Sequence, residues 1–502
     1  MSEEADHTRR WLINAGGAAI LSGAIPAAHA QTAPAPGAPA AVAPADTAGD
    51  LTPVSPATAT LADYVAKTLD RDLPAEVMVR TKLHVLDTLA AMVSGSRLKP
   101  GNLAARYVDS LGGKPQAMVI GTPIVTSAVN AALANAMAAH ADETDDTNPI
   151  GPVHPGCGAV SAALATGELA GRTGEDLLRA VTLGYDIGAR MVSALGVGQA
   201  SRRFSPSCLM TTFVAATTAA AMLRLDARQV RHTFSYAAQQ ASGLGFWTRD
   251  REHVEKAFDF GGMGARNGVM AATMVAMGFS AVEDPFSGDD NVYTALADKP
   301  APDKLLAELG SRYAVFDTTI KKWTVGAPLQ SVLDSVAALL DDPGVRADTI
   351  RHIRVDMPTA SLRIVDNSPI PDLCLQHLVA LMIVDRGATF ASVHEAARMS
   401  DPRVLAVRKL VELVPSAELQ AAVPARQAIV RIETADGRSL SHRTTVVRGT
   451  ARNPMDAREV EVKALDLMAP VLGSGRANEL VAAVGTLERI GPVSRLRALL
   501  QA

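Results

Sequence analysis

The chain has little cysteine, few aromatic residues and no excess of either charge. Its three cysteines (Cys157, Cys208 and Cys374 of 502 residues) are too few and too far apart for a disulfide framework, and no CxxC pair suggests a zinc ribbon. With 10 Phe, 6 Tyr, 3 Trp and a net charge of −4, the chain lacks the stacking platforms and basic excess of a nucleic-acid-binding surface. These shortages argue against a disulfide-rich domain and against a nucleic-acid partner. We expect the three thiols to be buried as small apolar side chains.

The N-terminal segment is typical of an export signal. Arg9-Arg10 stands before a short run rich in Gly and Ala, which ends in an A-x-A site at Ala30. The pattern resembles a twin-arginine-type signal peptide over residues 1–30, and it predicts a periplasmic protein. A membrane anchor is the alternative, but the run is short and interrupted by glycine and proline, so we favour cleavage. Residues 31–57 are rich in Ala and Pro and predict a disordered linker, and the mature form is expected to have no membrane contact.

The rest of the chain is mostly helical in pattern. From residue 58 onward apolar residues recur every three or four positions, and many of the segments are rich in alanine. The pattern changes near residue 317, because 352–358 alternates like a strand and 428–447 reads as two strands around Asp436-Gly437, a strong hairpin signal. Helical periodicity returns after Pro454.

This order predicts a mainly α fold with two domains. A large discontinuous all-helical domain would comprise residues 58–316 and 452–502, and a smaller α+β lid domain, residues 317–451, would be inserted into it. Two such domains leave a cleft between them, where ligands commonly bind.

The densest polar cluster follows an alanine-rich helix and reads HADETDDT, from His140 to Thr147, with His154-Pro-Gly shortly after. Four carboxylates at a helix end repel the helix dipole and one another, so cations, backbone N–H groups or water must balance them. Three interpretations stay open on this evidence alone. The cluster is a solvated acidic loop, a metal site of His and Asp/Glu ligands without a recognised spacing, or an acid/base site in which His154 moves a proton.

The same segment resembles the MmgE/PrpD family, and the similarity covers roughly residues 60–500. It extends to LLRAVTLGYDIGARM, EKAFDFGGMGARNGVMAATMVAMGF, TIKKW, LQHLVALMIVDRG and NPMDAREVEVKA. The resemblance implies a helical domain with a lid, small di- or tricarboxylate substrates, a homodimer, and neither metal nor organic cofactor.

Position by position, the resemblance also implies a set of site residues. The implied catalytic residues are His154, Lys256, Lys321 and His377. The implied substrate-binding residues are Glu143, Asp145, Asp146, Thr147, Ser205 and Arg266. Three positions depart from the family pattern: Glu143 replaces the usual Asp, Ser205 stands where several members have a second histidine, and His377 replaces a tyrosine.

These residues predict a cofactor-independent lyase or isomerase, of dehydratase or epimerase type, that abstracts a proton alpha to a carboxylate of a small di- or tricarboxylate. Fixed cations would stabilise the charge that develops, and His377 would act opposite His154. The alternatives are a catalytically degenerate periplasmic polycarboxylate-binding protein of the same fold, and a metal-dependent hydrolase. The remaining histidines are interpreted as structural or surface residues: His84, His232, His253, His352, His394 and His442.

Overall fold

The computed structural model describes residues 53–150, 153–196 and 205–502. The predicted signal peptide and most of the predicted linker lie outside these residues. Within the described ranges, no helix combines the length and apolarity needed to cross a bilayer.

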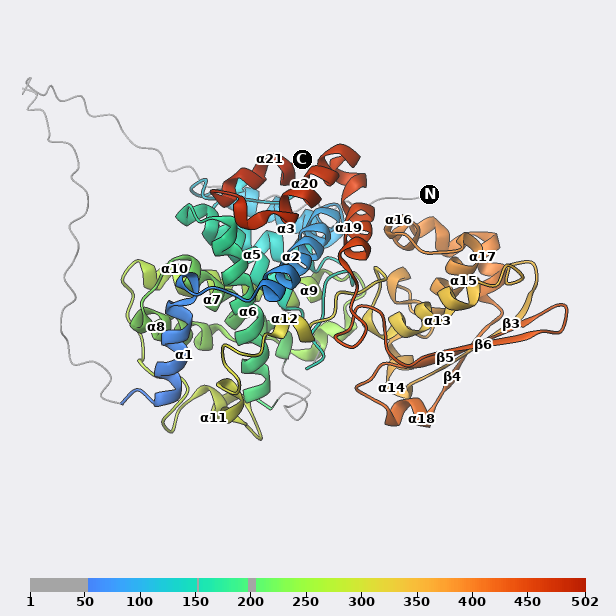
Figure 1. The fold of residues 1–502 in the computed structure, drawn as a ribbon, viewed down its shortest axis with the longest axis horizontal. Coiled ribbons are helices and arrows are strands. Elements are labelled where there is room, and N and C mark those ends of the chain that lie inside the picture. Colours follow the sequence, from blue (N-terminus) through green and yellow to red (C-terminus); the bar gives the residue numbers. More distant parts are fainter. Residues whose placement is uncertain (1–52, 151–152, 197–204) are drawn as a thin grey trace, which may run out of the picture. The chain divides into compact units, whose positions relative to one another are not determined.

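The helical body, our name for the described residues up to 320 and from 452 onward, is built from helices that differ widely in length (Figure 1). Its helices are α1 (Pro56–Ala66), α2 (Ala75–Gly95), α3 (Lys99–Leu111), α4 (Ala128–Ala139), α5 (Pro155–Ala170), α6 (Gly174–Ala194), α7 (Pro206–Met222), α8 (Ala227–Gln240), α9 (Val254–Ala257), α10 (Met263–Ala276), α11 (Val292–Leu296), α12 (Ala314–Asp317), α19 (Ala457–Leu472), α20 (Ser474–Gly485) and α21 (Arg497–Leu500). A π-helical turn, η3 (Phe258–Gly262), joins α9 to α10, and a short antiparallel pair is formed by β1 (Ala117–Met118) and β2 (Val125–Thr126).

Local sequence explains where several of these helices begin. Thr173 and Asp176 form a capping box at the start of α6, and Ser127 caps α4 by accepting a hydrogen bond from the backbone N–H of Asn130. The first helix starts at Pro56, inside the predicted linker, because Ser55 caps it and proline suits the first turn.

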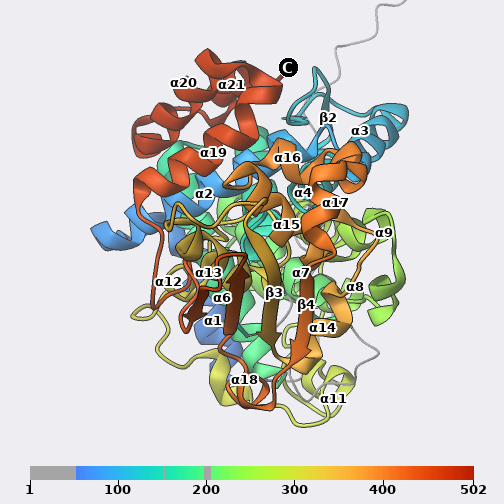
Figure 2. The same cartoon turned by 90° about the vertical axis from the view of Figure 1, so that its right-hand side faces the viewer.

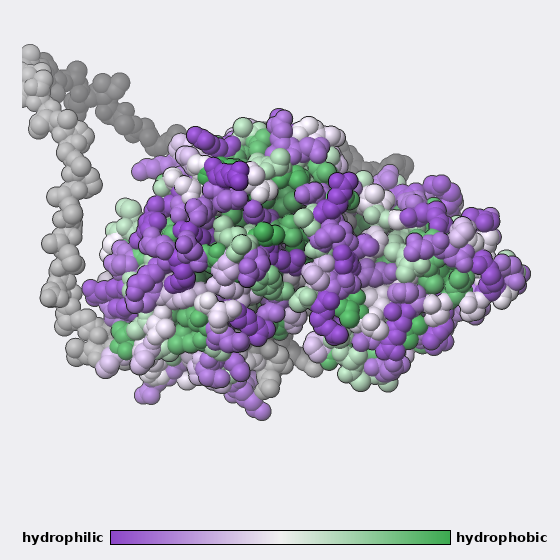
Figure 3. Space-filling model, viewed as in Figure 1, coloured by the Kyte–Doolittle hydropathy of each residue, from purple (hydrophilic) through white to green (hydrophobic). Residues whose placement is uncertain are grey.

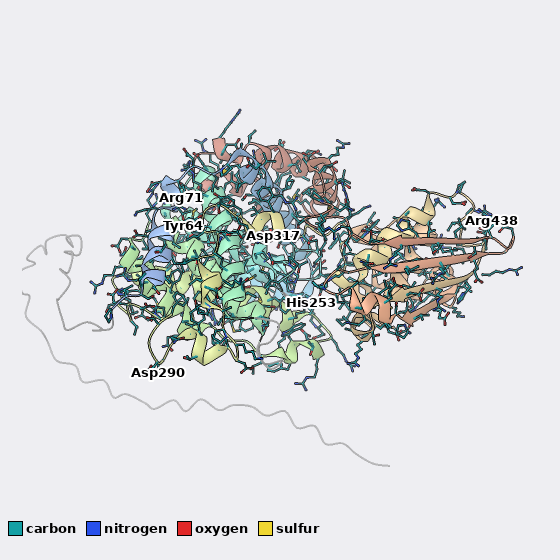
Figure 4. All side chains as sticks on the ribbon, turned by 60° about the horizontal axis from the view of Figure 1, so that its bottom comes forward. Tyr64, Arg71, His253, Asp290, Asp317 and Arg438 are labelled. Carbon is teal, nitrogen blue, oxygen red and sulfur yellow. The ribbon has the colours of Figure 1, made fainter. Side chains whose placement is uncertain are left out.

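The lid, our name for residues 323–451, contains the main sheet. Its elements are α13 (Gln330–Leu340), β3 (Ile350–Met357), α14 (Thr359–Val365), α15 (Leu375–Asp385), α16 (Phe390–His394), α17 (Pro402–Arg408), β4 (Val411–Pro415), α18 (Ala417–Ala421), β5 (Ala428–Thr434) and β6 (Ser439–Thr444). The strand order is β4-β3-β5-β6, with β4 parallel to β3 and the other pairs antiparallel (Figure 2). The predicted hairpin is confirmed, and the labelled Arg438 lies at its tip in Figure 4.

The two largest hydrophobic cores among the described residues follow this arrangement. One combines residues from Leu61 to Ile320 with residues from Met455 to Leu500, so the C-terminal helices complete the core that the N-terminal half begins. The other runs from Val325 to Ile432 and lies inside the lid. The predicted mainly α fold with a smaller α+β part is confirmed. The domain limits at 317 and 451 stay predictions, although the cores change close to them.

Candidate active site

The acidic loop, residues 140–148, links α4 to the segment before α5 and is anchored in the helical body by Asp146. This carboxylate accepts hydrogen bonds from His84 Nδ1 on α2 (2.9 Å), the Tyr185 hydroxyl on α6 (2.6 Å) and the backbone N–H of Gly156 (3.2 Å). A Cβ at position 156 would come within 2.9 Å of Asp146 Oδ1, so glycine allows this approach. Asp146, predicted to bind substrate, therefore serves as a buried anchor of the loop.

Asp145 joins two imidazoles. His140 Nδ1 and His154 Nδ1 each lie 3.0 Å from Asp145 Oδ1, and the two rings are 4.5 Å apart at their centroids. Burial alone raises the pKa of Asp145, but the two imidazoles outweigh burial and hold this pKa far below its ordinary value. An ionised carboxylate only accepts hydrogen bonds, so both histidines carry the hydrogen on Nδ1.

When an imidazole with this tautomer is neutral, its Nε2 carries a lone pair. Burial lowers the pKa of His140 to about 3, so His140 is neutral near neutral pH. Its Nε2 is buried and has no hydrogen-bond partner among the described residues. His154 is 5% exposed, so of these two rings it is the one that solvent or a ligand reaches. An imidazole whose tautomer is fixed by a carboxylate is the usual form of a general base.

Glu143 lies among cations in the same loop. Its Oε1 accepts a short hydrogen bond from Lys256 Nζ and another from His253 Nε2 at 3.1 Å, and its Oε2 is 4.0 Å from Lys321 Nζ. Burial raises the pKa of Glu143, but the charges of Lys256, His253 and Lys321 outweigh burial and hold this pKa well below its usual range.

Two buried lysines balance the loop through its backbone as well. Lys321 Nζ donates to the carbonyl oxygen of Glu143 (2.6 Å) and lies 3.9 Å from Asp145 Oδ1. Lys463 Nζ, from α19, donates to the carbonyl oxygen of Thr144 (3.0 Å) and to Asp87 Oδ1 (2.6 Å). Lys321 is fully buried, so the structure places this predicted substrate clamp as a support of the loop. The balancing cations that the sequence required are therefore present.

The Phe260 ring, on the π-helical turn, packs against the cluster. It stacks on His140 at 4.6 Å, meets His154 edge-on at 5.4 Å, and has Lys256 Nζ at 5.0 Å from its centre. The Trp247 ring packs perpendicular to the Phe260 ring, with the two ring centroids 4.7 Å apart. His154 and Lys256 therefore border one common apolar ring, although they are 102 positions apart in the chain.

A metal ion is the alternative use of this cluster. His140, Asp145 and His154 each offer a ligand atom, and these atoms lie within 4.8 Å of one another. The Lys321 ammonium, 3.9 Å from Asp145 Oδ1, opposes a second cation on that oxygen. The donor set therefore fits a hydrogen-bonded acid/base group better than a metal centre.

The lid contacts the acidic loop through His394 on α16. His394 Nε2 lies 2.8 Å from Asp142 Oδ2, off the line of a good hydrogen bond, so the contact is chiefly an ion pair. Burial lowers the pKa of His394, but the nearby Asp142 and Asp372 carboxylates outweigh burial and raise it to about 9. Phe390 on the same short helix donates its backbone N–H to Asp466 of α19 (2.7 Å) and packs against the body core.

Four predicted site residues make other contacts. His377 is fully buried in α15, and its ring nitrogens have no partner among the described residues. Burial lowers the pKa of His377, and the charges of Arg408 and Arg398 lower it further. Ser205 bonds Asp259, and Arg266 bonds Asn267. Thr147 pairs through its backbone with Thr319. None of these contacts joins the residue to the histidine cluster.

Besides His84, two further histidines interpreted as structural or surface residues contact the acidic loop, namely His253 and His394. His253 bonds Glu143, lies 5.2 Å from the His140 ring, and has a left-handed backbone with φ of 59°. In Figure 4 the labelled His253 lies on the side of the helical body that borders the lid. The contacts of His253 and His394 with the loop span more than 100 positions, and no local motif marks either residue.

Comparison with known proteins agrees with this architecture. The MmgE/PrpD N-terminal domain matches residues 59–304, and the MmgE/PrpD C-terminal domain matches residues 323–489. The human protein named cis-aconitate decarboxylase is 24% identical over 86% of this chain and 91% of its own length. The protein of the same name from Aspergillus terreus is 24% identical over 86% of this chain and 92% of its own. The two domain matches together span most of the sequence, and the chain belongs to the MmgE/PrpD family.

Proposed function

We propose that this protein is a cofactor-independent lyase or isomerase that forms a carbanion next to a carboxylate of a small di- or tricarboxylate. The observation that carries the proposal is the fixed tautomer of His154, whose Nδ1 is held by Asp145 at 3.0 Å beside Lys256 and the Phe260 ring. A base that is ready to take a proton, next to a fixed ammonium group, is what carbon-acid chemistry requires.

The chemistry follows from these positions. In proton abstraction, His154 Nε2 takes the hydrogen, and the electron pair left on carbon delocalises into the adjacent carboxylate, whose growing charge Lys256 stabilises. Delivery of a proton from solvent to the other face gives epimerisation. In dehydration, the β-hydroxyl group takes the proton from His154 as its bond to carbon breaks, and it leaves as water. In decarboxylation, the carbon–carbon bond breaks, carbon dioxide leaves, and protonated His154 delivers a proton to the carbanion. Each route uses the same imidazole and the same cation.

We take the first substrate to test from the names of the relatives. The human and Aspergillus proteins are named for decarboxylation of cis-aconitate, a tricarboxylate, which supports lyase activity at the level of the family. Identity of 24% does not extend that substrate to this chain by itself. The alternative of a degenerate binding protein gains no support, because these relatives bear the names of enzymes.

The test is proton NMR in deuterium oxide with cis-aconitate and a panel of saturated and hydroxylated di- and tricarboxylates. We expect deuterium to enter the carbon next to a carboxylate of at least one compound, with or without loss of carbon dioxide or water. The protein used is folded, and its metal content is measured. If no compound of the panel shows exchange or forms a product, the proposal is contradicted. Activity lost on chelation and regained with a metal ion would instead favour the metal-dependent hydrolase.

Periplasmic export and a homodimer also stay proposals. The export signal lies outside the described residues. Cell fractionation, with Arg9→Lys and Arg10→Lys together as the comparison, tests the location, and light scattering of the mature chain tests the dimer.

A further inference from the structure

Glu143 already engages the cationic group that the proposed function reserves for substrate. Lys256 Nζ and His253 Nε2 both contact its Oε1, and Lys321 Nζ lies 4.0 Å from its Oε2. The side chain is 7% exposed, and the Lys256 side chain is 14% exposed. The protein's own carboxylate therefore sits where a substrate carboxylate would be bound.

Two ionised carboxylates cannot share these cations at low cost, because like charges a few ångströms apart repel strongly in a buried site. The same cations hold the pKa of Glu143 well below its usual range, although burial raises it, so protonation does not remove the conflict near neutral pH. Either Glu143 leaves Lys256 when substrate binds, or substrate does not reach Lys256.

The backbone of the loop cannot supply that movement. Lys321 holds the carbonyl oxygen of Glu143, Lys463 holds that of Thr144, and the Thr144 N–H donates to Asp142 Oδ1 at 2.9 Å. Rotation about the side-chain torsions of Glu143 would move its carboxylate without moving this backbone.

We propose that Glu143 is a specificity-determining residue, whose carboxylate occupies the substrate's anion position and is exchanged on Lys256 and His253 for a substrate carboxylate. This rests on the proposed function, since it assumes a polycarboxylate ligand. The exchange disfavours ligands that present a single carboxylate. Their binding breaks the contacts of Glu143 with Lys256 and His253, and they have no second carboxylate to form another ion pair. Substrates with two or three carboxylates compensate through further contacts.

Calorimetric titration with propane-1,2,3-tricarboxylate, which has no leaving group, tests this exchange. Glu143→Gln keeps the shape and removes the charge, and Glu143→Asp keeps the charge and withdraws it by one methylene group. We expect Glu143→Gln to bind the tricarboxylate about tenfold more tightly or better, and Glu143→Asp to bind it more tightly than wild type. Lys256→Met should weaken binding by a larger factor in the Glu143→Gln background than in the wild-type background.

Glu255→Gln is the matched control, because it removes one charge from an exposed residue beside Lys256 and should leave the affinity unchanged. Thermal melts establish whether each variant folds. If Glu143→Gln does not fold, the test rests on Glu143→Asp. Equal or weaker binding by folded Glu143 variants, while the wild type binds the tricarboxylate, would overturn the exchange and leave the proposed function standing. No binding by any folded form would overturn the exchange, and the deuterium-exchange panel decides the proposed function separately.

Discussion

The acidic loop and helix α15 of the lid both bury histidines, yet they bury them in opposite ways. Burial lowers the pKa of His140 in the loop to about 3 and that of His377 in α15 to about 4. His140 and His154 share the Asp145 carboxylate, whereas both nitrogens of His377 lack a partner among the described residues. A lowered pKa alone therefore does not distinguish a proton-transfer group from a core residue. A carboxylate that fixes the tautomer, together with access to ligand, does.

The surroundings of the acidic loop are charged, whereas those of helix α15 are apolar. The loop is held by groups from several helices of the body and by one helix of the lid, and its charges are paired. Helix α15 contributes apolar residues to the lid core, from Leu375 to Ile383. The face of the molecule seen in Figure 3 is a mosaic of hydrophilic and hydrophobic residues.

The largest effect is expected from His154→Gln, which removes the proposed base that Asp145 of the acidic loop holds. We expect turnover on any substrate identified by deuterium exchange to fall by about 10³-fold, because general acid–base catalysis contributes roughly this much. Steady-state kinetics measure the loss. His352→Gln, at a half-exposed lid histidine, is the control and should keep full activity. Full turnover by His154→Gln would contradict the role of His154 as the base and that of the acidic loop in holding it.

Asp145→Asn should cost about a hundredfold or more, because an amide at this position no longer holds the hydrogen of His154 on Nδ1. His140→Gln removes the other imidazole on the same carboxylate and should cost less, since the tautomer of His154 survives. Nitrogen-15 NMR of the histidine rings reports the tautomer directly. Equal losses in the two variants, with an unchanged His154 tautomer, would contradict the orienting role of Asp145.

The ion pair between the lid and the loop should appear as pH-dependent stability. The folded pKa of His394 is raised to about 9, above the value of about 6.5 for an unfolded chain. Its stabilisation, up to about 3 kcal/mol, is therefore complete below about pH 6.5 and is lost as the pH rises through about 9. Urea unfolding of wild type and His394→Gln at pH 6 and pH 10 measures the difference, which should be large at the lower pH only. A constant difference would show that Asp142, Asp372 and Asp466 do not hold the charge of His394.

The smallest effect is expected from His377→Leu in α15. Removing a buried ring without hydrogen-bond partners should raise the free energy of unfolding by about 1 kcal/mol and leave turnover within about twofold. Chemical denaturation and kinetics on the same preparation check both parts. A loss of turnover as large as that of His154→Gln would restore His377 to the role that the sequence predicted for it.

Much of the fold could be predicted because its signals are local. The Thr173 capping box, the strand at Ile350–Met357 and the Asp436-Gly437 hairpin depend on residues a few positions apart. Strand β4 was not predicted, because Val411–Pro415 is short and pairs in parallel with β3 across more than 50 positions. The acidic loop and the need for balancing cations were also visible, since four carboxylates at one helix end require them.

The sequence by itself determined the helical class, the inserted sheet and the presence of a charged loop shortly before His154. Tertiary structure alone decided which groups meet that loop: His253 and Lys256 on Glu143, Lys463 on Thr144, and His394 on Asp142. The physical reason is that backbone propensity and apolar periodicity act over a few residues, whereas pairing of buried charges depends on which distant side chains the core brings within a few ångströms.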